Sequence, residues 1–184
     1  MMRDAFALSE EFSLPVIFRP TTRICHSKGD VDLGEIGTEH RTAAFHRNPK
    51  QYVVIPAHTR VLHKILNEKQ PALKERLVEL GYNRHTIRGK TAVVASGAAA
   101  AYVREVLGAD VSLAVIGAYP IDDEWLRAFV DRHEKVLVIE ELDPVVEEVV
   151  RQVATKTEVL GKMTGTVPFE GEFTPATVAA AMRE

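Results

Sequence analysis

The chain has one cysteine, Cys25, in 184 residues. A single cysteine excludes an intramolecular disulfide and any zinc or iron–sulfur site built from clustered cysteines. Lysine and arginine together number 23 against 26 aspartates and glutamates, so the chain has no excess of positive charge that would attract nucleic acid. No uninterrupted apolar stretch approaches the length of a membrane span, and the acids Asp4, Glu10 and Glu11 stand where a signal peptide would be apolar. We therefore expect a cytoplasmic protein with no nucleic-acid or membrane partner.

Motifs for catalysis and for metal binding are also missing. His58 and His63 are five residues apart, which differs from the four-residue spacing of a helical metal pair, and there is no HExxH motif. Cys25 and His26 are neighbours in sequence, but a nucleophile and its base need a third group that orients them. We expect no catalytic residue and no metal ligand in this chain, and a free-standing hydrolase has no set of residues to support it.

The second half of the chain alternates apolar runs with helical patterns. Strands are expected at 91–96, 111–116, 135–139 and 158–160, each followed by a helix or a glycine-rich loop. Continuous apolar strands are typical of a parallel sheet that is covered on both faces. The sequence therefore predicts an α/β fold, a three-layer sandwich with a mainly parallel sheet.

The first half is less regular. Apolar spacing predicts a first helix up to Phe12 and a buried strand at 14–18, and a second short strand is expected at 52–55. Residues 24–57 have little periodicity, which is typical of an extended connector that lies over other structure. A helical pattern follows from 59 to 80, and we expect Pro71 to break or kink it.

Two places have a composition that suits anions. Arg19, Thr21, Thr22 and Arg23 combine guanidinium groups and hydroxyls just past a predicted strand. Guanidinium groups bind carboxylates and phosphates, so these residues are candidates for an anion site or for the rim of a cleft. The alternative is that they form ion pairs and helix caps that attach the connector to a neighbouring domain.

The second place is the junction of Ser96 and Gly97 between a strand and a helix. Unpaired backbone N–H groups at a helix start attract anions. Only one glycine is present and no lysine follows it, so the junction is neither a dinucleotide fingerprint nor a Walker motif. The alternative is that Ser96 or Gly97 only caps the helix. With the arginines above, this junction supports a second possible function, a stand-alone regulatory α/β domain that binds a small anion or a nucleotide.

Three acids end the strand at 135–139, and this edge is where open α/β sheets usually place their sites. Adjacent strand residues point to opposite faces, so Glu140 and Glu141 are not expected to line one pocket together. Asp143 before Pro144 is typical of a helix start. We expect one of the two glutamates to face a cleft or a neighbouring subunit, and we favour an interface role for Glu140 and Glu141.

Several phrases, in order along nearly the whole chain, resemble one family of enzymes. They are LSEEFSLPVIFRPTTRICHSKG, YVVIPAH, ASGAAAAYV, YPI, VLVIEELDPVVEE, and GKMTG followed by PFEGEFTP. The chain resembles an internal fragment of the large (alpha) subunit of indolepyruvate ferredoxin oxidoreductase, of the 2-oxoacid:ferredoxin oxidoreductase group. The resemblance implies that 1–23 are the tail of a pyrimidine-binding thiamine-diphosphate domain, 24–88 a connector with a helix, and 89–184 a transketolase C-terminal-like domain with one antiparallel edge strand.

The resemblance also implies a function for the whole enzyme. Such enzymes oxidatively decarboxylate aryl pyruvates to aryl-acetyl coenzyme A and pass electrons to ferredoxin. Their cofactors are thiamine diphosphate, magnesium, iron–sulfur clusters and coenzyme A. The implied partners are the remaining domains of the same subunit, the smaller subunit, ferredoxin through the whole enzyme, and a second copy in a possible homodimer.

The chain departs from this family by omission. The family's diphosphate and magnesium motif begins Gly-Asp-Gly, and the only Gly-Asp here is Gly29-Asp30. The four-cysteine cluster motifs are absent as well. We therefore expect an excised portion that binds none of these cofactors and is inactive alone, with a structural and docking role.

Overall fold

The computed structural model describes residues 1–35, 37 and 44–183. The chain forms two compact units, residues 1–69 and residues 70–184. The division lies within helix α4 (Pro56–Glu79), and each unit is described by itself. The boundaries expected from the resemblance, after residues 23 and 88, stay predictions.

A five-stranded sheet forms the centre of residues 70–183. Its strands lie in the order β1-β3-β2-β4-β5. Their bounds are β1 Asn83–Thr86, β2 Thr91–Ser96, β3 Val111–Ile116, β4 Lys135–Ile139 and β5 Glu158–Leu160. Strands β2 to β5 are parallel to one another, and β1 pairs antiparallel with β3 at one edge. The four strands predicted from sequence are confirmed with the same bounds, whereas no strand was predicted at 83–86.

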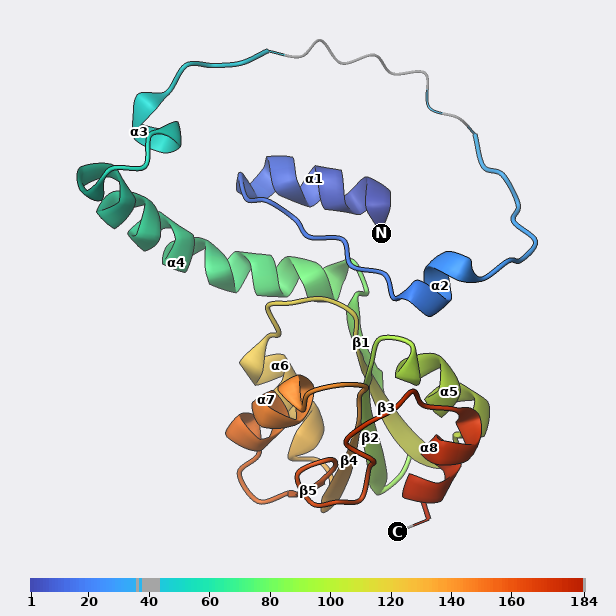
Figure 1. Ribbon diagram of the computed structural model, residues 1–184. Helices are drawn as coiled ribbons and strands as arrows, with labels where there is room; N and C mark the ends of the chain where they lie inside the picture. The colour runs from blue at the N-terminus through green and yellow to red at the C-terminus, as the bar shows by residue number, and fades with distance from the viewer. Residues whose placement is uncertain (36, 38–43, 184) are drawn as a thin grey trace. The chain divides into compact units, whose positions relative to one another are not determined.

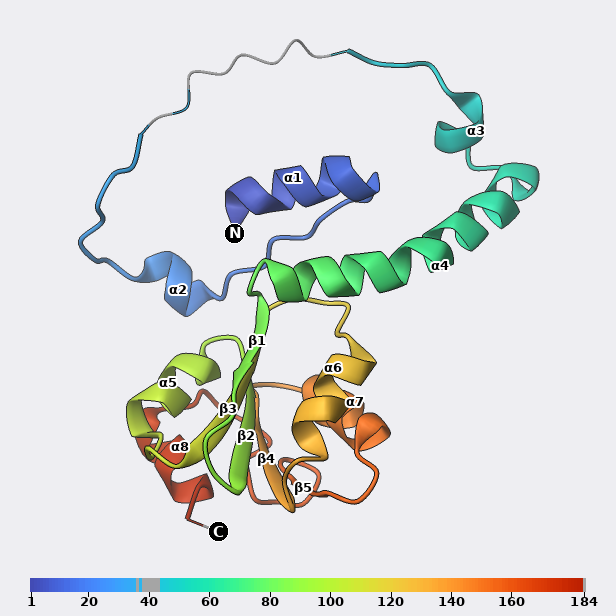
Figure 2. The same cartoon turned by 180° about the vertical axis from the view of Figure 1, so that it is seen from behind.

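Helices cover both faces of this sheet (Figures 1 and 2). Helices α5 (Ala99–Val106) and α8 (Pro175–Ala181) lie on one face, and α6 (Asp123–Val130) and α7 (Val145–Val153) lie on the other. Side chains of β2 alternate between the two layers, since Val93 packs with the α5 and α8 residues while Val94 packs with the α6 and α7 residues. This alternation follows from the two-residue period of a strand. The predicted three-layer sandwich is confirmed.

Two of these helices begin at residues whose side chains cap them. The Asp122 carboxylate accepts the backbone N–H of Trp125 at 2.7 Å, and the Thr174 hydroxyl accepts that of Thr177 at 3.2 Å. Pro175 occupies the first position of α8, where its missing N–H costs nothing. Thr174 and Pro175 together fix the start of α8.

Residues 1–69 contain helices and extended segments. The helices are α1 Met2–Phe12, α2 Thr22–His26, α3 Pro49–Tyr52 and the first part of α4. The strand predicted at 14–18 is wrong, because this extended segment pairs with no strand among the described residues. The strand predicted at 52–55 is wrong as well, because Pro49 starts a helical turn that includes Tyr52. An apolar run becomes a strand only where a partner supplies the ladder hydrogen bonds.

Helix α4 continues through Pro71, so the proline does not break the helix, and a kink there stays a prediction. Proline removes one backbone hydrogen bond from a helix interior. Residues with high helix propensity stand on both sides, including Lys69 and Ala72, and they continue the helix across this loss. Within the part of the chain that the structure describes, no helix is both long enough and apolar enough to cross a membrane.

Candidate functional site at the carboxyl edge of the sheet

The sheet order creates a change of direction between β2 and β4. The chain leaves β2 towards β3 on one side and later returns to β4 on the other side. Binding sites of open α/β sheets lie at such a point, outside the carboxyl ends of the strands. Ala95 pairs with Ile139 across the two strands, so the predicted residues Ser96, Gly97, Glu140 and Glu141 all follow at this one edge.

Glu140 is buried, with 4% of its surface exposed, and its carboxylate caps helix α7. The carboxylate accepts the backbone N–H of Val146 at 2.9 Å and of Glu147 at 2.7 Å. Burial raises the pKa of Glu140 above its usual value, and the two backbone hydrogen bonds oppose that rise. The carboxylate thus satisfies two of the N–H groups that a helix start leaves without partners.

The predicted helix start at Asp143 is wrong. Helix α7 begins at Val145, its cap residue Pro144 has no side-chain hydrogen bond, and the Asp143 side chain is exposed. Leu142 has a φ of 64°, in the left-handed region. The turn at Leu142 lies between Glu140 and α7, and the Glu140 carboxylate occupies the place that the Asp143 side chain was expected to take.

Glu141 bonds to the other layer. Its carboxylate accepts the backbone N–H of Phe173 at 2.7 Å, and Phe173 is buried just before α8. The expected separation of Glu140 and Glu141 to opposite faces is therefore confirmed. The hydrogen bonds give both glutamates a role inside the chain, and their interface role stays a prediction.

Glu147, in the first turn of α7, is buried and forms an ion pair with Arg151. Its carboxylate is 1% exposed and accepts from Arg151 Nη2 at 2.8 Å and from the backbone N–H of Met163 at 3.2 Å. Arg151 Nη2 also donates to the carbonyl of Val159 in β5 at 2.8 Å. A buried charge is tolerated where such partners surround it. Glu147 therefore connects α7 to β5 and to the loop that follows β5.

Lys162 lies in that loop and is 5% exposed. Its Nζ donates to the carbonyls of Pro168 at 2.7 Å and Phe169 at 2.9 Å, and it lies 4.9 Å from the centre of the Phe173 ring. Burial lowers the pKa of Lys162, and nearby carboxylates, Glu140 first among them, oppose this shift. The ammonium group holds together the loop between β5 and α8.

Asn83 holds the loop that follows β3. The side chain is fully buried, and its Oδ1 accepts the backbone N–H groups of Gly117 and Ala118, both at 3.1 Å. Its Nδ2 donates to the carbonyl of Ala118 at 3.0 Å. One amide thus satisfies three backbone groups where β3 ends beside β1.

The hydrogen bonds described above at this edge are structural. The carboxylates of Glu140, Glu141 and Glu147 accept from backbone N–H groups, and Lys162 donates to backbone carbonyls. Among the described residues, no three histidine, cysteine or acidic side chains converge as metal ligands would. The geometry supports a scaffold that fixes the loops after β3, β4 and β5.

Comparison with curated proteins finds relatives of a single name. The chain is 37% identical to the indolepyruvate oxidoreductase subunit IorA of Methanothermobacter thermautotrophicus over 91% of its length. It is 37% identical to IorA of Methanothermobacter marburgensis over 98% of its length, and 39% identical to IorA of Thermococcus kodakarensis over 82%. The chain is related to a part of this oxidoreductase subunit. The resemblance inferred from the sequence phrases is confirmed.

The similarity to IorA covers a part of each relative. The chain spans 29%, 31% and 25% of the lengths of these three IorA subunits. No protein-family profile matches the chain. No solved structure matches it either, so the likeness to a transketolase C-terminal domain stays a prediction.

The first group of anion candidates lies in residues 1–69 and consists of Arg19, Thr21, Thr22 and Arg23. Arg19 is exposed in an extended segment. The Thr21 hydroxyl caps α2 by accepting the backbone N–H of Ile24 at 3.4 Å, while Thr22 and Arg23 form the first turn of that helix. The predicted capping role is thus seen at Thr21, and anion binding by these residues stays a prediction.

The other anion candidates follow β2. Gly97 has a φ of 57°, a left-handed conformation that glycine adopts without strain. The cap residue of α5 is Ala98, which makes no side-chain hydrogen bond, so neither Ser96 nor Gly97 is the cap residue. The carbonyl of Gly97 accepts the N–H of Ala100 at 3.3 Å. Anion binding at this junction stays a prediction.

A buried serine–histidine pair was not predicted from sequence. His133 Nδ1 lies 2.9 Å from the carbonyl of Phe129, which only accepts, so this nitrogen carries the proton. Ser112 Oγ lies 2.9 Å from Nε2 and 3.3 Å from the carbonyl oxygen of Gly89, and it accepts the backbone N–H of Arg88 at 3.0 Å. Ser112 is fully buried and His133 is 3% exposed, so no substrate reaches this pair and it has a structural role.

Proposed function

We propose that the chain is a structural and docking portion of a thiamine-diphosphate-dependent indolepyruvate:ferredoxin oxidoreductase subunit. The whole enzyme oxidatively decarboxylates aryl pyruvates to aryl-acetyl coenzyme A and passes electrons to ferredoxin. The similarity to IorA over most of the chain supports this assignment. The chain itself contributes a folded domain and a contact surface, and it is inactive alone.

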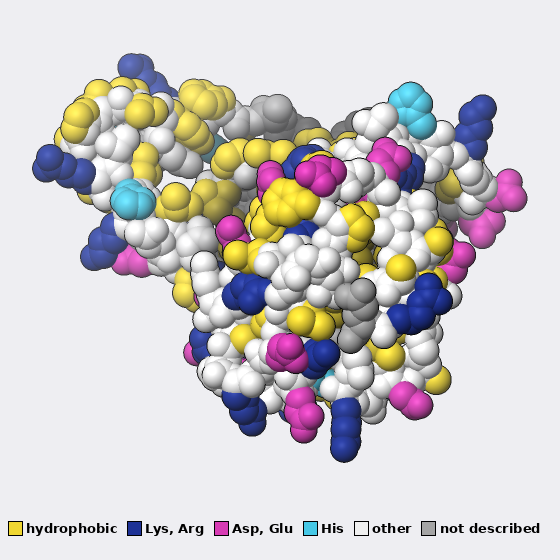
Figure 3. Space-filling model, turned by 60° about the horizontal axis from the view of Figure 1, so that its bottom comes forward, with side chains coloured by type: hydrophobic (Ala, Val, Ile, Leu, Met, Phe, Trp, Pro, Cys, Tyr) yellow, Lys and Arg dark blue, Asp and Glu magenta, His cyan; other side chains and the backbone are white. Residues whose placement is uncertain are grey.

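The observation that carries the docking role is the contrast between the two units. Residues 70–183 have their own core on both sides of the sheet. Among the described residues of 1–69, Leu8 is the one buried large apolar side chain, with 7% of its surface exposed. Large apolar side chains of this unit are exposed instead, among them Ile17 at 88%, Leu33 at 91% and Val54 at 82%. Figure 3 shows such side chains gathered over α3 and the start of α4.

An apolar surface of this kind marks an interaction site. Its occupant under this proposal is the remainder of the oxidoreductase subunit, because each relative extends well beyond the stretch that the chain matches. The smaller subunit, ferredoxin and a second copy of the subunit are partners of the whole enzyme. Covering the exposed side chains stabilises the complex in proportion to the apolar area removed from water.

The cofactors of the whole enzyme do not fit the donor set of this chain. A diphosphate with magnesium needs clustered oxygen ligands. Gly29 and Asp30, the one Gly-Asp pair of the chain, are exposed in an extended segment of residues 1–69. The buried carboxylates at the carboxyl edge already accept hydrogen bonds from the backbone. No step of the decarboxylation is assigned to this chain.

Titration calorimetry with thiamine diphosphate and magnesium tests the cofactor part of the proposal. We expect no binding heat from the chain alone. Binding at micromolar concentration would overturn the conclusion that the cofactor ligands lie elsewhere, and the chain would then belong to the cofactor site.

Co-purification tests the docking part. The chain is expressed with the rest of the Methanothermobacter thermautotrophicus IorA subunit, from which the matching stretch is removed. We expect the chain and the rest of the subunit to purify together. The double variant Ile17→Asp, Val54→Asp should abolish this co-purification. The matched control is Val145→Asp, an exposed apolar residue of the other unit. Independent elution of the two unaltered polypeptides would contradict the proposal.

A further inference from the structure

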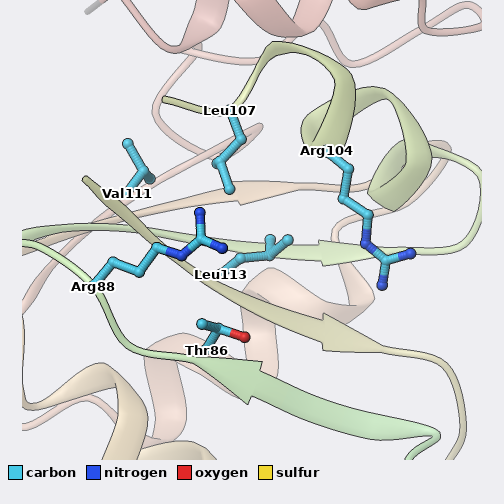
Figure 4. A pocket seen from close by; sticks show the side chains of 6 residues that line it. All are labelled: Thr86, Arg88, Arg104, Leu107, Val111 and Leu113. Carbon is cyan, nitrogen blue, oxygen red and sulfur yellow. The ribbon is translucent and has the colours of Figure 1, made fainter. Parts of the chain in front are cut away.

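A pocket lies beside the antiparallel edge strand β1, on the face of the sheet that α5 covers. Its volume is about 250 Å³. The residues that line it are Thr86, Arg88, Arg104, Leu107, Val111 and Leu113 (Figure 4). They come from β1, the turn after it, the last turns of α5 and strand β3. None of the residues predicted from sequence as site candidates is among them.

Positive charge enters the pocket from two separate segments. Figure 4 shows the guanidinium groups of Arg88 and Arg104 on either side of Leu113, and no acidic side chain lines the pocket. Within the described part of the chain, neither guanidinium donates a hydrogen bond or forms an ion pair. By contrast, Arg84 and Arg132 donate to the carbonyls of Gly81 and Ala128. The donors of Arg88 and Arg104 are thus available to a bound molecule.

The floor of the pocket is apolar. Leu113 is 9% exposed, and Leu107 and Val111 are half-buried beside it. A guanidinium binds a carboxylate or a phosphate through two parallel hydrogen bonds. An apolar floor adds affinity for a ligand that also carries an apolar group. The lining therefore selects a molecule that has both parts.

The backbone that carries Arg88 is fixed before any ligand binds. Its N–H donates to the buried hydroxyl of Ser112 at 3.0 Å, and that hydroxyl is held in turn by His133. The next residue, Gly89, lies so close to Asp110 that a Cβ at position 89 would overlap the Asp110 carbonyl oxygen. A site whose supporting residues are fixed loses less entropy when a ligand binds.

We propose that this pocket binds a small organic anion, with its carboxylate or phosphate between Arg88 and Arg104 and a short apolar group against Leu107, Val111 and Leu113. The site is independent of the docking role. It lies towards the amino end of β3, whereas the carboxylate network described above lies at the carboxyl edge. The proposed anion site is therefore separate from that structural network.

The test is an amide NMR titration of the whole 184-residue chain. The probes are phenyl phosphate, benzoate, inorganic phosphate and benzyl alcohol. We expect saturable shifts at the amides of 86–88 and 104–113 with phenyl phosphate or benzoate, weaker shifts with inorganic phosphate, and none with benzyl alcohol. Saturation by phenyl phosphate alone identifies a phosphate site, and saturation by benzoate identifies a carboxylate site.

Two variants assign the binding to the arginines. Arg88→Gln and Arg104→Gln should each weaken binding by about tenfold or more, the usual loss for a charged hydrogen bond. Arg84→Gln is the matched control, because Arg84 lies on β1, four residues before Arg88, and outside the lining. Circular dichroism checks that all three variants fold. Absent shifts with every probe, or equal affinity in the three variants, would overturn the proposal.

Discussion

The carboxylate of Glu140 accepts the backbone N–H of Glu147 at 2.7 Å, so a residue that directly follows strand β4 closes the first turn of helix α7. The second oxygen accepts the N–H of Val146 at 2.9 Å. A carboxylate at a helix start also interacts favourably with the helix dipole. Strand, turn and helix are thus joined by one buried side chain.

Replacing Glu140 by alanine should lower the free energy of unfolding. The change leaves two backbone donors of α7 buried without an acceptor, and each costs about 1–3 kcal/mol. Urea unfolding followed by circular dichroism measures the loss. Glu148→Ala is the control, since Glu148 lies in the same first turn and is exposed. An equal loss in both variants would show that Glu140 does not act as the cap.

The pH dependence of unfolding should reveal the burial of Glu140. Its pKa is raised above the usual value of a glutamate, because burial outweighs the two hydrogen bonds. A carboxyl with a raised pKa in the folded state contributes stability that is present below its unfolded pKa and is lost as pH rises through its folded pKa. The wild-type chain should therefore gain stability relative to Glu140→Gln as pH falls from neutral towards the unfolded pKa.

The measurement is the difference in unfolding free energy between the two chains at a series of pH values. Titrations common to both chains cancel in this difference. A difference that shrinks as pH falls would mean that the hydrogen bonds from Val146 and Glu147 outweigh burial and that the pKa is lowered instead.

Local signals explain which elements the sequence predicted well. Strands β2 and β4 are apolar runs bounded by polar residues, so the local sequence pattern is enough to predict them as buried strands. Strand β1 reads Asn-Arg-His-Thr and has no apolar period. It is a strand because β3 pairs with it and because Asn83 bonds the loop after β3. Those contacts join residues 27 to 34 positions apart, and no local pattern indicates them.

The candidate site also has features that the local sequence predicts and features that depend on the folded chain. The opposite directions of Glu140 and Glu141 follow from strand geometry, so they were predictable. The capping by Glu140 was not, because the chain must first turn through the left-handed conformation at Leu142, which leucine rarely adopts. The pocket between Arg88 and Arg104 depends on two elements that only the folded sheet brings together.

Gly161→Ala should destabilise the chain through Glu147. A Cβ at position 161 would lie 2.5 Å from Cδ of Glu147, closer than real side chains approach. The Glu147 carboxylate is held by Arg151 and by the N–H of Met163, so it has little freedom to move. We expect a loss of about 1–3 kcal/mol, typical of overpacking in a core, measured by urea unfolding.

Gly108→Ala is the control for this change. A Cβ there meets Val111 at 3.7 Å, an ordinary contact, and should change the stability little. Shortening the acid with Glu147→Asp should relieve part of the overlap, so the double variant should lose less than the sum of the single variants. Additive losses would show that the two residues do not collide.

Asn83→Ala should loosen the loop after β3. The change removes the acceptor of the Ala118 N–H and the donor to the Ala118 carbonyl, whereas the Gly117 N–H keeps a second acceptor, the carbonyl of Tyr82 at 3.1 Å. We expect a loss of about 3 kcal/mol, since each buried group left unsatisfied costs about 1–3 kcal/mol. Amide hydrogen exchange at Gly117 and Ala118 should become faster, while exchange in β4 changes only with global stability.

Asn83→Asp separates the acceptor role from the donor role. The aspartate keeps both acceptor contacts but presents an oxygen to the Ala118 carbonyl in place of Nδ2. Because a buried carboxyl has a raised pKa, its protonated form should donate to that carbonyl at low pH. The stability of Asn83→Asp should therefore approach that of the wild type as pH falls, whereas Asn83→Ala stays unstable throughout. Parallel pH profiles for the two variants would show that the Nδ2 hydrogen bond contributes nothing to this loop.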